Sequence, residues 1–252
     1  MDLNLVLDKI IMNIGNPLLA REEALRAQGA DAMSVNGVIN KTGILFLALA
    51  AAFGYTWHLF FQGQDVTMYT MGGAIAGFIL ALVIIFGKMA TPFLVVPYAI
   101  CQGLFLGGTS AFLEKAYPGI VIQAVLLTMT CFGGILAAYH FKVIQYSPGL
   151  AKFITISILG IVAAYLVSFI GGFFGMPLNF LHDSSPLSIG ISIFIVVIAT
   201  ISFIIDFEAI KQASERGVEK KQEWYFSFGL MVSLVWLYLE ILRLLAKLRG
   251  RD

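Results

Sequence analysis

Seven long runs of apolar residues, joined by short polar connections, dominate the pattern along the chain. Each run is apolar on all sides and close to the roughly 20 residues that an α-helix needs to cross a bilayer. Strands of a membrane barrel would instead be about 10 residues long and alternate in polarity. The pattern therefore predicts an all-α membrane protein, a bundle of seven transmembrane helices. The runs occupy residues 43–61, 71–87, 93–113, 120–138, 153–175, 187–205 and 224–245.

Residues 1–41 precede the first run and differ from it in character. Acidic residues from Asp2 to Asp31 interrupt them, and they lack the cleavable apolar segment and small-residue cleavage site of a signal peptide. Residues 3–14 are weakly amphipathic, which suits either a solvated tail or an interfacial helix. We expect a solvated N-terminal tail at 1–41, a transmembrane domain at 42–248 and a short C-terminal tail at 249–252.

The composition agrees with a membrane protein. Hydrophobic residues make up 59% of the chain and charged residues only 12%, about half of the ~25% found in ordinary globular domains. A soluble domain of 252 residues needs more polar groups than this to cover its surface. The net charge of +1 provides no basic field for nucleic acid. We therefore expect the lipid bilayer, and no nucleic acid, as a partner.

The distribution of lysine and arginine predicts the orientation, because cytoplasmic loops carry an excess of both. The segments on the side of the N-terminal tail hold eleven of these residues, so the N-terminus is predicted to be cytoplasmic. Seven crossings then place the basic C-terminus outside, so either the last helix is partly re-entrant or this cluster tolerates the outer face. The eleven are Lys9, Arg21, Arg26, Lys41, Lys88, Lys142, Lys152, Lys211, Arg216, Lys220 and Lys221, and the other side holds Lys115, Arg243, Lys247, Arg249 and Arg251.

Two pairs of glycines, Gly73 with Gly77 and Gly103 with Gly107, each place small residues on one helix face. This spacing lets helix backbones approach closely. Such pairs can serve either a dimer seam or packing within one bundle. With seven helices to pack, we favour packing within the bundle.

Few side chains in the apolar runs can do chemistry. His58, His140 and His182 lie in separate segments without the paired spacing of a zinc site. Cys101 and Cys131 lie in apolar runs, where thiols pack as small hydrophobic groups. The chain contains no G-x-S-x-G motif, P-loop or dinucleotide fingerprint. We therefore expect neither an enzyme nor a bound cofactor.

Two acidic residues interrupt the apolar pattern deep in the last two helices. Asp206 follows an unbroken apolar stretch, and Glu240 lies about sixteen residues into the last helix. An ionised carboxylate at such depth costs several kcal/mol, so it normally faces the protein interior and finds a partner or a proton. The alternative to a functional acid is a structural ion pair, for which Arg243 lies three residues after Glu240.

Small and polar residues continue from these acids along one face of each helix, and the two faces can lie opposite each other. Two carboxyl groups held close share a proton, and when deprotonated they attract hard cations such as Ca²⁺ through oxygen ligands. The residues alone therefore suggest a proton-gated cation path with Asp206 and Glu240 as transient calcium ligands. At 1.5 Å per residue, these acids meet only if the last helix starts lower or if residues 223–228 run along the interface. The two faces comprise Ser188, Ser192, Ala199, Ser202 and Asp206, and Gly229, Ser233, Glu240 and Lys247.

Several motifs, spread over nearly the whole chain, resemble the Bax-inhibitor (transmembrane Bax inhibitor motif) family, in particular its bacterial branch. The strongest stretch is DFEAI at 206–210, followed by EWY at 223–225 and then FGLMV at 228–232 through Arg243. The other motifs are MSVNGVINKTGI at 33–44, YAICQGLFLG at 98–107 and YPGIVIQAV at 117–125.

This resemblance implies a fold in which six helices surround a central last helix. It also implies a proton-sensitive calcium leak, in which buried acids on the sixth and seventh helices sense pH. Asp206 matches the first acid, and Glu240 stands where better-known branches usually have aspartate. Lys88 is the only candidate for the basic residue that pairs with the acids in some members. Further candidates for ion pairs or the pathway are Glu208, Glu223 and Arg243.

We therefore expect a pH-sensitive calcium leak channel in a bacterial inner (plasma) membrane, with calcium as the permeant ion. Asp206 and Glu240 would form a gate that is closed when protonated and open to calcium when ionised. The alternative is a non-conducting regulator that binds another membrane protein, such as a quality-control protease, through the N-terminal tail and the short loops. An enzyme ranks third, because the chain lacks a nucleophile–base constellation.

Overall fold

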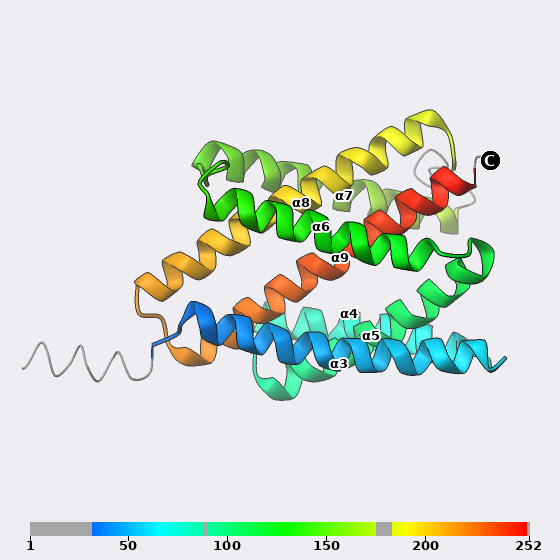
Figure 1. Cartoon of the computed structure of the whole chain (residues 1–252), viewed down its shortest axis with the longest axis horizontal. Helices are drawn as coiled ribbons and strands as arrows, with labels where there is room; N and C mark the ends of the chain where they lie inside the picture. Colours follow the sequence, from blue (N-terminus) through cyan, green and yellow to red (C-terminus); the bar gives the residue numbers. More distant parts are fainter. Residues whose placement is uncertain (1–31, 88–89, 175–182, 251–252) are drawn as a thin grey trace, which may run out of the picture.

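The computed structural model describes residues 32–87, 90–174 and 183–250. These ranges contain seven helices that are long and apolar enough to cross a membrane, which confirms the predicted bundle. A single turn of 3₁₀-helix, η2 (Lys220–Gln222), precedes the last of them. In chain order the helices are α3 (Val35–Phe61), α4 (Thr67–Gly87), α5 (Pro92–Ala116), α6 (Ile120–His140), α7 (Pro148–Phe173), α8 (Pro186–Glu215) and α9 (Glu223–Arg249) (Figure 1).

Serine caps explain why several helices begin earlier than their apolar runs. Ser34 precedes α3, and its Oγ accepts a hydrogen bond from the backbone N–H of Gly37 at 2.9 Å. Ser147 and Ser185 cap α7 and α8 in the same way, each followed by a proline. A cap satisfies a backbone donor that has no partner within the helix, and proline has the φ angle that the first turn needs. The apolar runs therefore mark the part of each helix that suits hydrocarbon, while the caps set where it begins.

The helices alternate in direction, so the bundle has two ends (Figure 1). We call the end at which α3, α5, α7 and α9 begin the amino end, and the end at which they finish the carboxyl end. Helix α9 is unbroken from Glu223 to Arg249, so it crosses the bundle without re-entering. The start of α3 and the end of α9 consequently lie at opposite ends of the bundle.

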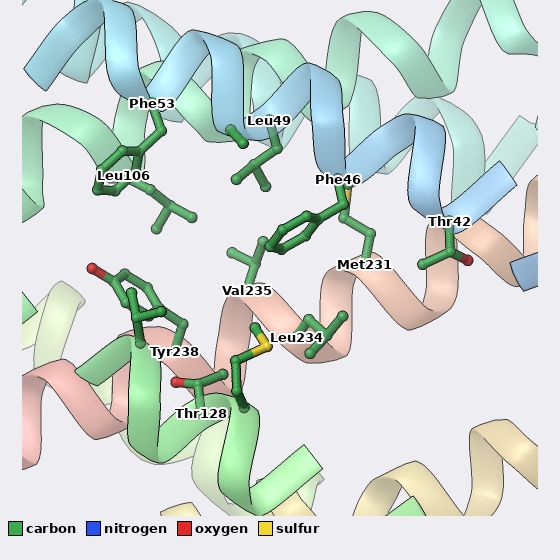
Figure 2. A pocket seen from close by; sticks show the side chains of 13 residues that line it. Thr42, Phe46, Leu49, Phe53, Leu106, Thr128, Met231, Leu234, Val235 and Tyr238 are labelled. Atoms are coloured by element: carbon green, nitrogen blue, oxygen red, sulfur yellow. The ribbon is translucent and has the colours of Figure 1, made fainter. Parts of the chain in front are cut away.

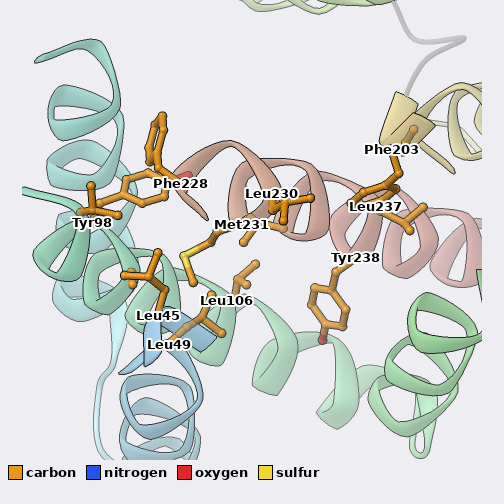
Figure 3. Close-up of a cluster of buried hydrophobic side chains, with 14 of the residues drawn as sticks. Leu45, Leu49, Tyr98, Leu106, Phe203, Phe228, Leu230, Met231, Leu237 and Tyr238 are labelled. Carbon is orange, nitrogen blue, oxygen red and sulfur yellow. The ribbon is translucent and has the colours of Figure 1, made fainter. Parts of the chain in front are cut away.

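Helix α9 lies at the centre of the bundle, as the family resemblance implies. It packs against α3, α5, α6 and α8, and it runs between α3 and α6 in Figure 1. Its side chains Phe228, Met231 and Leu237 belong to one continuous buried cluster that also contains Leu45 of α3 (Figure 3). The ring of Phe228 meets that of Tyr98 on α5 edge to face, with centroids 4.9 Å apart. Helices α3, α5, α6 and α8 therefore share α9 as a common packing partner.

Helices α4 and α7 pack on the outside of the bundle and present large apolar side chains outward. Phe78 and Phe86 of α4 are 63% and 80% exposed, and Phe169 of α7 is 67% exposed. Exposure of such a continuous apolar surface to water would be unfavourable, whereas lipid acyl chains can cover it at no cost. The chain is thus an integral membrane protein whose outer surface contacts lipid.

A crevice separates α3 from α6. A cavity of about 200 Å³ lies between them near the middle of the bundle, with α5 and α9 completing its walls (Figure 2). A second cavity of about 1080 Å³ extends from there toward the amino end and is lined by α3, α6, α8 and α9. Both cavities are lined by Thr42, Phe46, Met129 and Leu234, so together they form one crevice.

The two glycine pairs pack helices within the bundle, as the sequence analysis favours. An added Cβ at Gly73 would lie 2.6 Å from the carbonyl oxygen of Cys101, so α4 approaches the backbone of α5 here. On α5, Gly103 and Gly107 face the backbone of α3, and a Cβ at Gly107 would lie 2.5 Å from the carbonyl oxygen of Phe53. Helix α5 is therefore held between α3 and α4 by close backbone contact.

Gly73 and its neighbour Gly72 provide a matched test of this packing. Gly73→Ala should destabilise the protein by about 1–3 kcal/mol, because the new methyl group collides with the backbone of α5. Gly72→Ala should be neutral or stabilising, since no atom lies within 4 Å of the added Cβ and alanine favours a helix by about 1 kcal/mol over glycine. Thermal unfolding of the two variants in detergent measures the difference. Equal melting temperatures would contradict the close approach of α4 and α5.

Candidate functional site

The predicted faces of α8 and α9 do lie opposite each other. Near the amino end, the Ser233 Oγ of α9 donates a hydrogen bond to Oδ2 of Asp206 on α8 at 2.7 Å. Near the carboxyl end, the Lys247 ammonium donates to the hydroxyl oxygens of Ser188 and Ser192, both at 2.8 Å. Because α8 and α9 are antiparallel, a single alignment of the two helices allows both contacts. We call this interface between α8 and α9 the polar seam.

Asp206 lies nine residues before the end of α8, roughly 14 Å from the amino end of the bundle, where α8 finishes. Its carboxylate is partly buried, and the Ser233 hydroxyl is its hydrogen-bond donor among the described residues. Ser188 and Ser202 are fourteen residues apart along α8, close to four helical turns, so both small side chains lie on the same face. Ser202 bonds back to its own helix through the carbonyl of Ala199. Asp206 therefore faces α9, and the Ser233 hydroxyl is its hydrogen-bond partner among the described residues.

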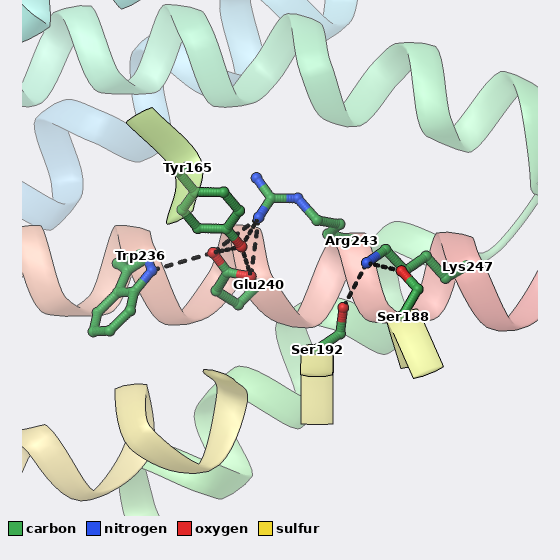
Figure 4. Close-up of polar contacts among 7 residues, drawn as sticks. All are labelled: Tyr165, Ser188, Ser192, Trp236, Glu240, Arg243 and Lys247. Carbon is green, nitrogen blue, oxygen red and sulfur yellow. Dashed lines mark hydrogen bonds and ion pairs between the residues drawn. The ribbon is translucent and has the colours of Figure 1, made fainter. Parts of the chain in front are cut away.

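Glu240 lies closer to the carboxyl end and has more partners. Its side chain is 2% exposed, and both of its oxygens accept hydrogen bonds from the Tyr165 hydroxyl of α7 at 3.1 Å and from Nη1 of Arg243 at 3.0 Å (Figure 4). Oε1 also accepts from Nε1 of Trp236 at 3.2 Å. The Arg243 guanidinium lies over the Tyr165 ring, 5.0 Å from its centroid. Glu240 is thus held in an ion pair with Arg243, the alternative considered for it from the sequence.

The structure does not bring Asp206 and Glu240 together, so the expected proton-sharing pair is not formed. Helix α9 begins at Glu223 without an interfacial stretch, which places Ser233 at the level of Asp206. Glu240 is seven residues further along, roughly 10 Å away. A shared proton requires the two carboxyl groups to be in contact. The two acids instead occupy separate positions along the polar seam.

Lys247 is buried beside the N-terminus of α8. Its residue is 6% exposed, and the two serine hydroxyls of α8 solvate its ammonium group. Asp183, just before α8, is exposed, and hydrogen bonds from Ser185 hold the pKa of its carboxyl group below the ordinary value, with a smaller contribution from the charge of Lys247. The carboxyl end of the seam therefore carries the cations Arg243 and Lys247 beside one buried carboxylate.

Glu223 lies at the start of α9 and ties it to the start of α3. Its side chain is 1% exposed and pairs with Lys41, and it accepts hydrogen bonds from the backbone N–H of Ser34 at 2.9 Å and from the Ser34 hydroxyl at 3.4 Å. An added Cβ at Gly37 would collide with the Glu223 carboxylate. Ser34, Gly37 and Lys41 share one face of α3, so the motif at 33–44 forms the cradle for this carboxylate.

Glu208, a further candidate, lies away from the polar seam. Glu208 faces α6, and its carboxylate accepts hydrogen bonds from the Tyr139 hydroxyl at 2.7 Å and from Nε2 of Gln212 at 2.9 Å. Lys88 lies outside the described residues. Among the described residues, no three His, Cys, Asp or Glu side chains come close enough to hold a metal ion.

Sequence reasoning missed two groups of partners. Tyr165 of α7 completes the Glu240 site, but it stands alone in an apolar run and carries no spacing signal. Lys41 and Ser34 bind Glu223 across more than 180 residues of sequence. The spacing of Ser34, Gly37 and Lys41 on one helix face was a signal for a shared partner, although it did not identify Glu223.

The Lys41–Glu223 pair predicts an effect on stability. Lys41→Met should destabilise the protein by about 3–5 kcal/mol, because it leaves a buried carboxylate without its cation. The matched control is Lys221→Met, whose pair with Glu219 is exposed and should be worth about 0–1 kcal/mol. Thermal unfolding in detergent measures both. The double variant Lys41→Met/Glu223→Met should recover much of the lost stability. A Lys41→Met protein as stable as the control would contradict a stabilising role for the Lys41–Glu223 pair.

Comparison with known proteins now identifies the family. A family profile described as "Bax inhibitor 1 like" matches residues 16–250. No curated protein and no solved structure matches the chain. The profile covers the entire described bundle, including the cradle around Glu223, the central helix α9 and both acids of the polar seam. The chain therefore belongs to the Bax inhibitor 1-like family.

Proposed function

We propose that the chain is a pH-sensitive calcium leak channel in which ions move along the polar seam between α8 and α9. The observation that carries this proposal is the position of two carboxylates, partly buried Asp206 and buried Glu240, at two depths of one seam. A charged group within a membrane span is costly to place and normally marks an ion or proton pathway when it faces the interior. Membership of the Bax inhibitor 1-like family agrees with this proposal.

Asp206 is the proposed proton-sensing position. Its carboxylate and the Ser233 hydroxyl offer a passing Ca²⁺ the oxygen ligands that this ion prefers. Protonation of Asp206 removes the negative charge, and with it the attraction for the cation. Flux should therefore fall as the pH decreases. Ser233 would remain as a neutral oxygen that is too weak to replace the hydration of a divalent ion.

The Glu240–Arg243 pair is the proposed closed gate. The guanidinium neutralises Glu240, so the paired carboxylate has no net charge with which to attract Ca²⁺. Lys247, about one turn further along α9, adds a positive charge that repels the ion. Opening then requires the guanidinium to swing away from Glu240, which exposes the carboxylate to the ion. The Tyr165 hydroxyl can keep its hydrogen bond to Glu240 during this change.

The contacts of the basic C-terminal residues support a cytoplasmic N-terminus. Arg243 pairs with Glu240, Lys247 binds two serines, and Arg249 donates to the carbonyl of Pro118 and to Oε1 of Gln123. The positive-inside rule concerns charges in short loops that can interact with the cytoplasmic leaflet. Arg243, Lys247 and Arg249 are thus engaged within the protein, which removes most of the conflict with an external C-terminus. We infer that the amino end faces the cytoplasm of a bacterial inner membrane.

Asp206→Asn tests the proton-sensing role. The amide keeps an oxygen for the Ser233 hydroxyl but carries no charge, so calcium flux at neutral pH should fall about tenfold and should no longer change as the pH is lowered. Proteoliposomes that contain the full chain and a calcium dye measure both effects. Glu219→Gln, the same type of change at an exposed position, should behave like the wild-type protein.

Two results would exclude the leak. Unchanged flux and pH response in Asp206→Asn would show that the seam does not carry the ion. A wild-type protein without flux would leave the alternative of a non-conducting regulator that binds another membrane protein. In that case deletion of residues 1–30 should abolish its function in cells, whereas the leak hypothesis predicts that this deletion leaves flux intact.

Arg243 and Glu240 should have opposite effects on flux. Arg243→Gln removes the positive charge and frees the Glu240 carboxylate, so calcium flux should rise about tenfold in the same assay. Glu240→Gln leaves the guanidinium unpaired on the path, so flux should fall. Equal losses in both variants, with the fold intact by circular dichroism, would show that the pair is structural and does not act as a gate.

A further inference from the structure

The crevice between α3 and α6 is a feature that the proposed calcium pathway does not use. It lies on the side of α9 that faces α3 and α6, where Leu234 and Val235 line it, and Asp206 is not among its lining residues. Its larger part, about 1080 Å³, is at the upper limit of typical ligand-binding cavities. A cavity of this size between packed helices requires an occupant, since interiors otherwise fill their space with side chains.

The deep part of the crevice, near the middle of the bundle, is apolar. Figure 2 shows Phe46, Leu49 and Phe53 of α3 facing Val235 and Tyr238 of α9 across it. The Tyr238 hydroxyl is engaged by Ser110 at 2.7 Å, so it is not directed at an occupant. A hydrocarbon chain matches this lining, whereas water would have no hydrogen-bonding partners there.

The mouth of the crevice, at the amino end, is polar and carries positive charge. Lys142 follows α6 and Lys211 lies on α8, and both are exposed and line the cavity together with His140. Glu208 also lines it, but its carboxylate is already bound by Tyr139 and Gln212. The mouth therefore complements an anionic group at the level where lipid headgroups lie.

Thr42 lies where the polar and apolar parts meet. Its Oγ1 is buried and has no hydrogen-bond partner among the described residues. The carbonyl of Val38, one turn earlier, instead accepts a bond from Ser227 of α9. A buried hydroxyl without a partner costs about 1–3 kcal/mol in general, so an acceptor supplied by an occupant would stabilise it. The ester oxygens of a glycerolipid lie between its headgroup and its acyl chains, which is the position of Thr42 in the crevice.

We propose that the crevice binds one anionic phospholipid, with its phosphate group against Lys142 and Lys211, an ester oxygen at Thr42 and one acyl chain between α3 and α6. Three features of the crevice select this occupant: the charge at the mouth, the lone hydroxyl at the junction and the apolar inner part. The proposal does not depend on calcium conduction.

Native mass spectrometry of the full chain tests the headgroup. Delipidated protein is titrated with phosphatidylglycerol and with phosphatidylcholine of the same acyl chains, and phosphatidylglycerol should bind more tightly. Lys142→Gln/Lys211→Gln should weaken phosphatidylglycerol binding about thirtyfold and leave phosphatidylcholine unchanged. Lys152→Gln/Lys220→Gln removes two exposed lysines from the same end but outside the crevice, and it should have no effect. Equal losses in both double variants would overturn the site.

Two further variants test the inner parts of the crevice. Ala50 lines the deep cavity and its neighbour Ala51 is exposed outside it, so Ala50→Phe should abolish phosphatidylglycerol binding and Ala51→Phe should not. Thr42→Val should raise the melting temperature of the delipidated protein and weaken lipid binding severalfold. Phosphatidylglycerol binding that neither Ala50→Phe nor Thr42→Val reduces would show that the lipid binds elsewhere on the bundle.

Discussion

A charged side chain within a bilayer-spanning helix needs a partner inside the protein, and the structure of this chain depends on how it meets that requirement. Most of its membrane-embedded charge lies on α9. Glu223 pairs with Lys41, Glu240 pairs with Arg243, and the Lys247 ammonium binds the serines of α8. A helix with this many charges cannot face lipid. Its position at the centre, with the charge-free α4 at the periphery, follows from the distribution of charge as much as from hydrophobic packing.

The same requirement separates the functions of the two ends of α9. At the amino end, Glu223 fixes the start of α9 against the start of α3, and Gly37 leaves the space that its carboxylate needs. Near the carboxyl end, Glu240 and Arg243 satisfy each other within a single helix, with Tyr165 as a further donor. An ion pair within one helix can break without unfolding the bundle, whereas the contacts of Glu223 with Ser34 and Lys41 join helices that are distant in sequence. The stabilising role and the proposed gating role therefore belong to different acids.

The membrane class, the seven spans and the facing of α8 and α9 could all be predicted from the sequence. Apolar runs reflect the thickness of a bilayer, and Ser188, Ser192 and Lys247 recur at helical spacing, so these features are local. The separation of Asp206 from Glu240 could not be predicted in this way. It depends on where α9 begins relative to α8, and a shift of seven residues along one helix moves a side chain by roughly 10 Å. The Tyr165 and Lys41 contacts were missed because a single polar residue in an apolar run does not indicate its partner.

The polar seam is electrostatically asymmetric, and this asymmetry gives the proposed pathway a direction. Its amino end presents Asp206 with only a neutral hydroxyl beside it, so a cation or a proton can approach a carboxylate there. Its carboxyl end holds two cations, Arg243 and Lys247, around the single carboxylate of Glu240. Repulsion between Ca²⁺ and these groups grows as distance decreases and is strong where water is excluded. In the proposed pathway the barrier to cations therefore lies toward the carboxyl end, and the proposed proton-sensing position, Asp206, lies nearer the amino end.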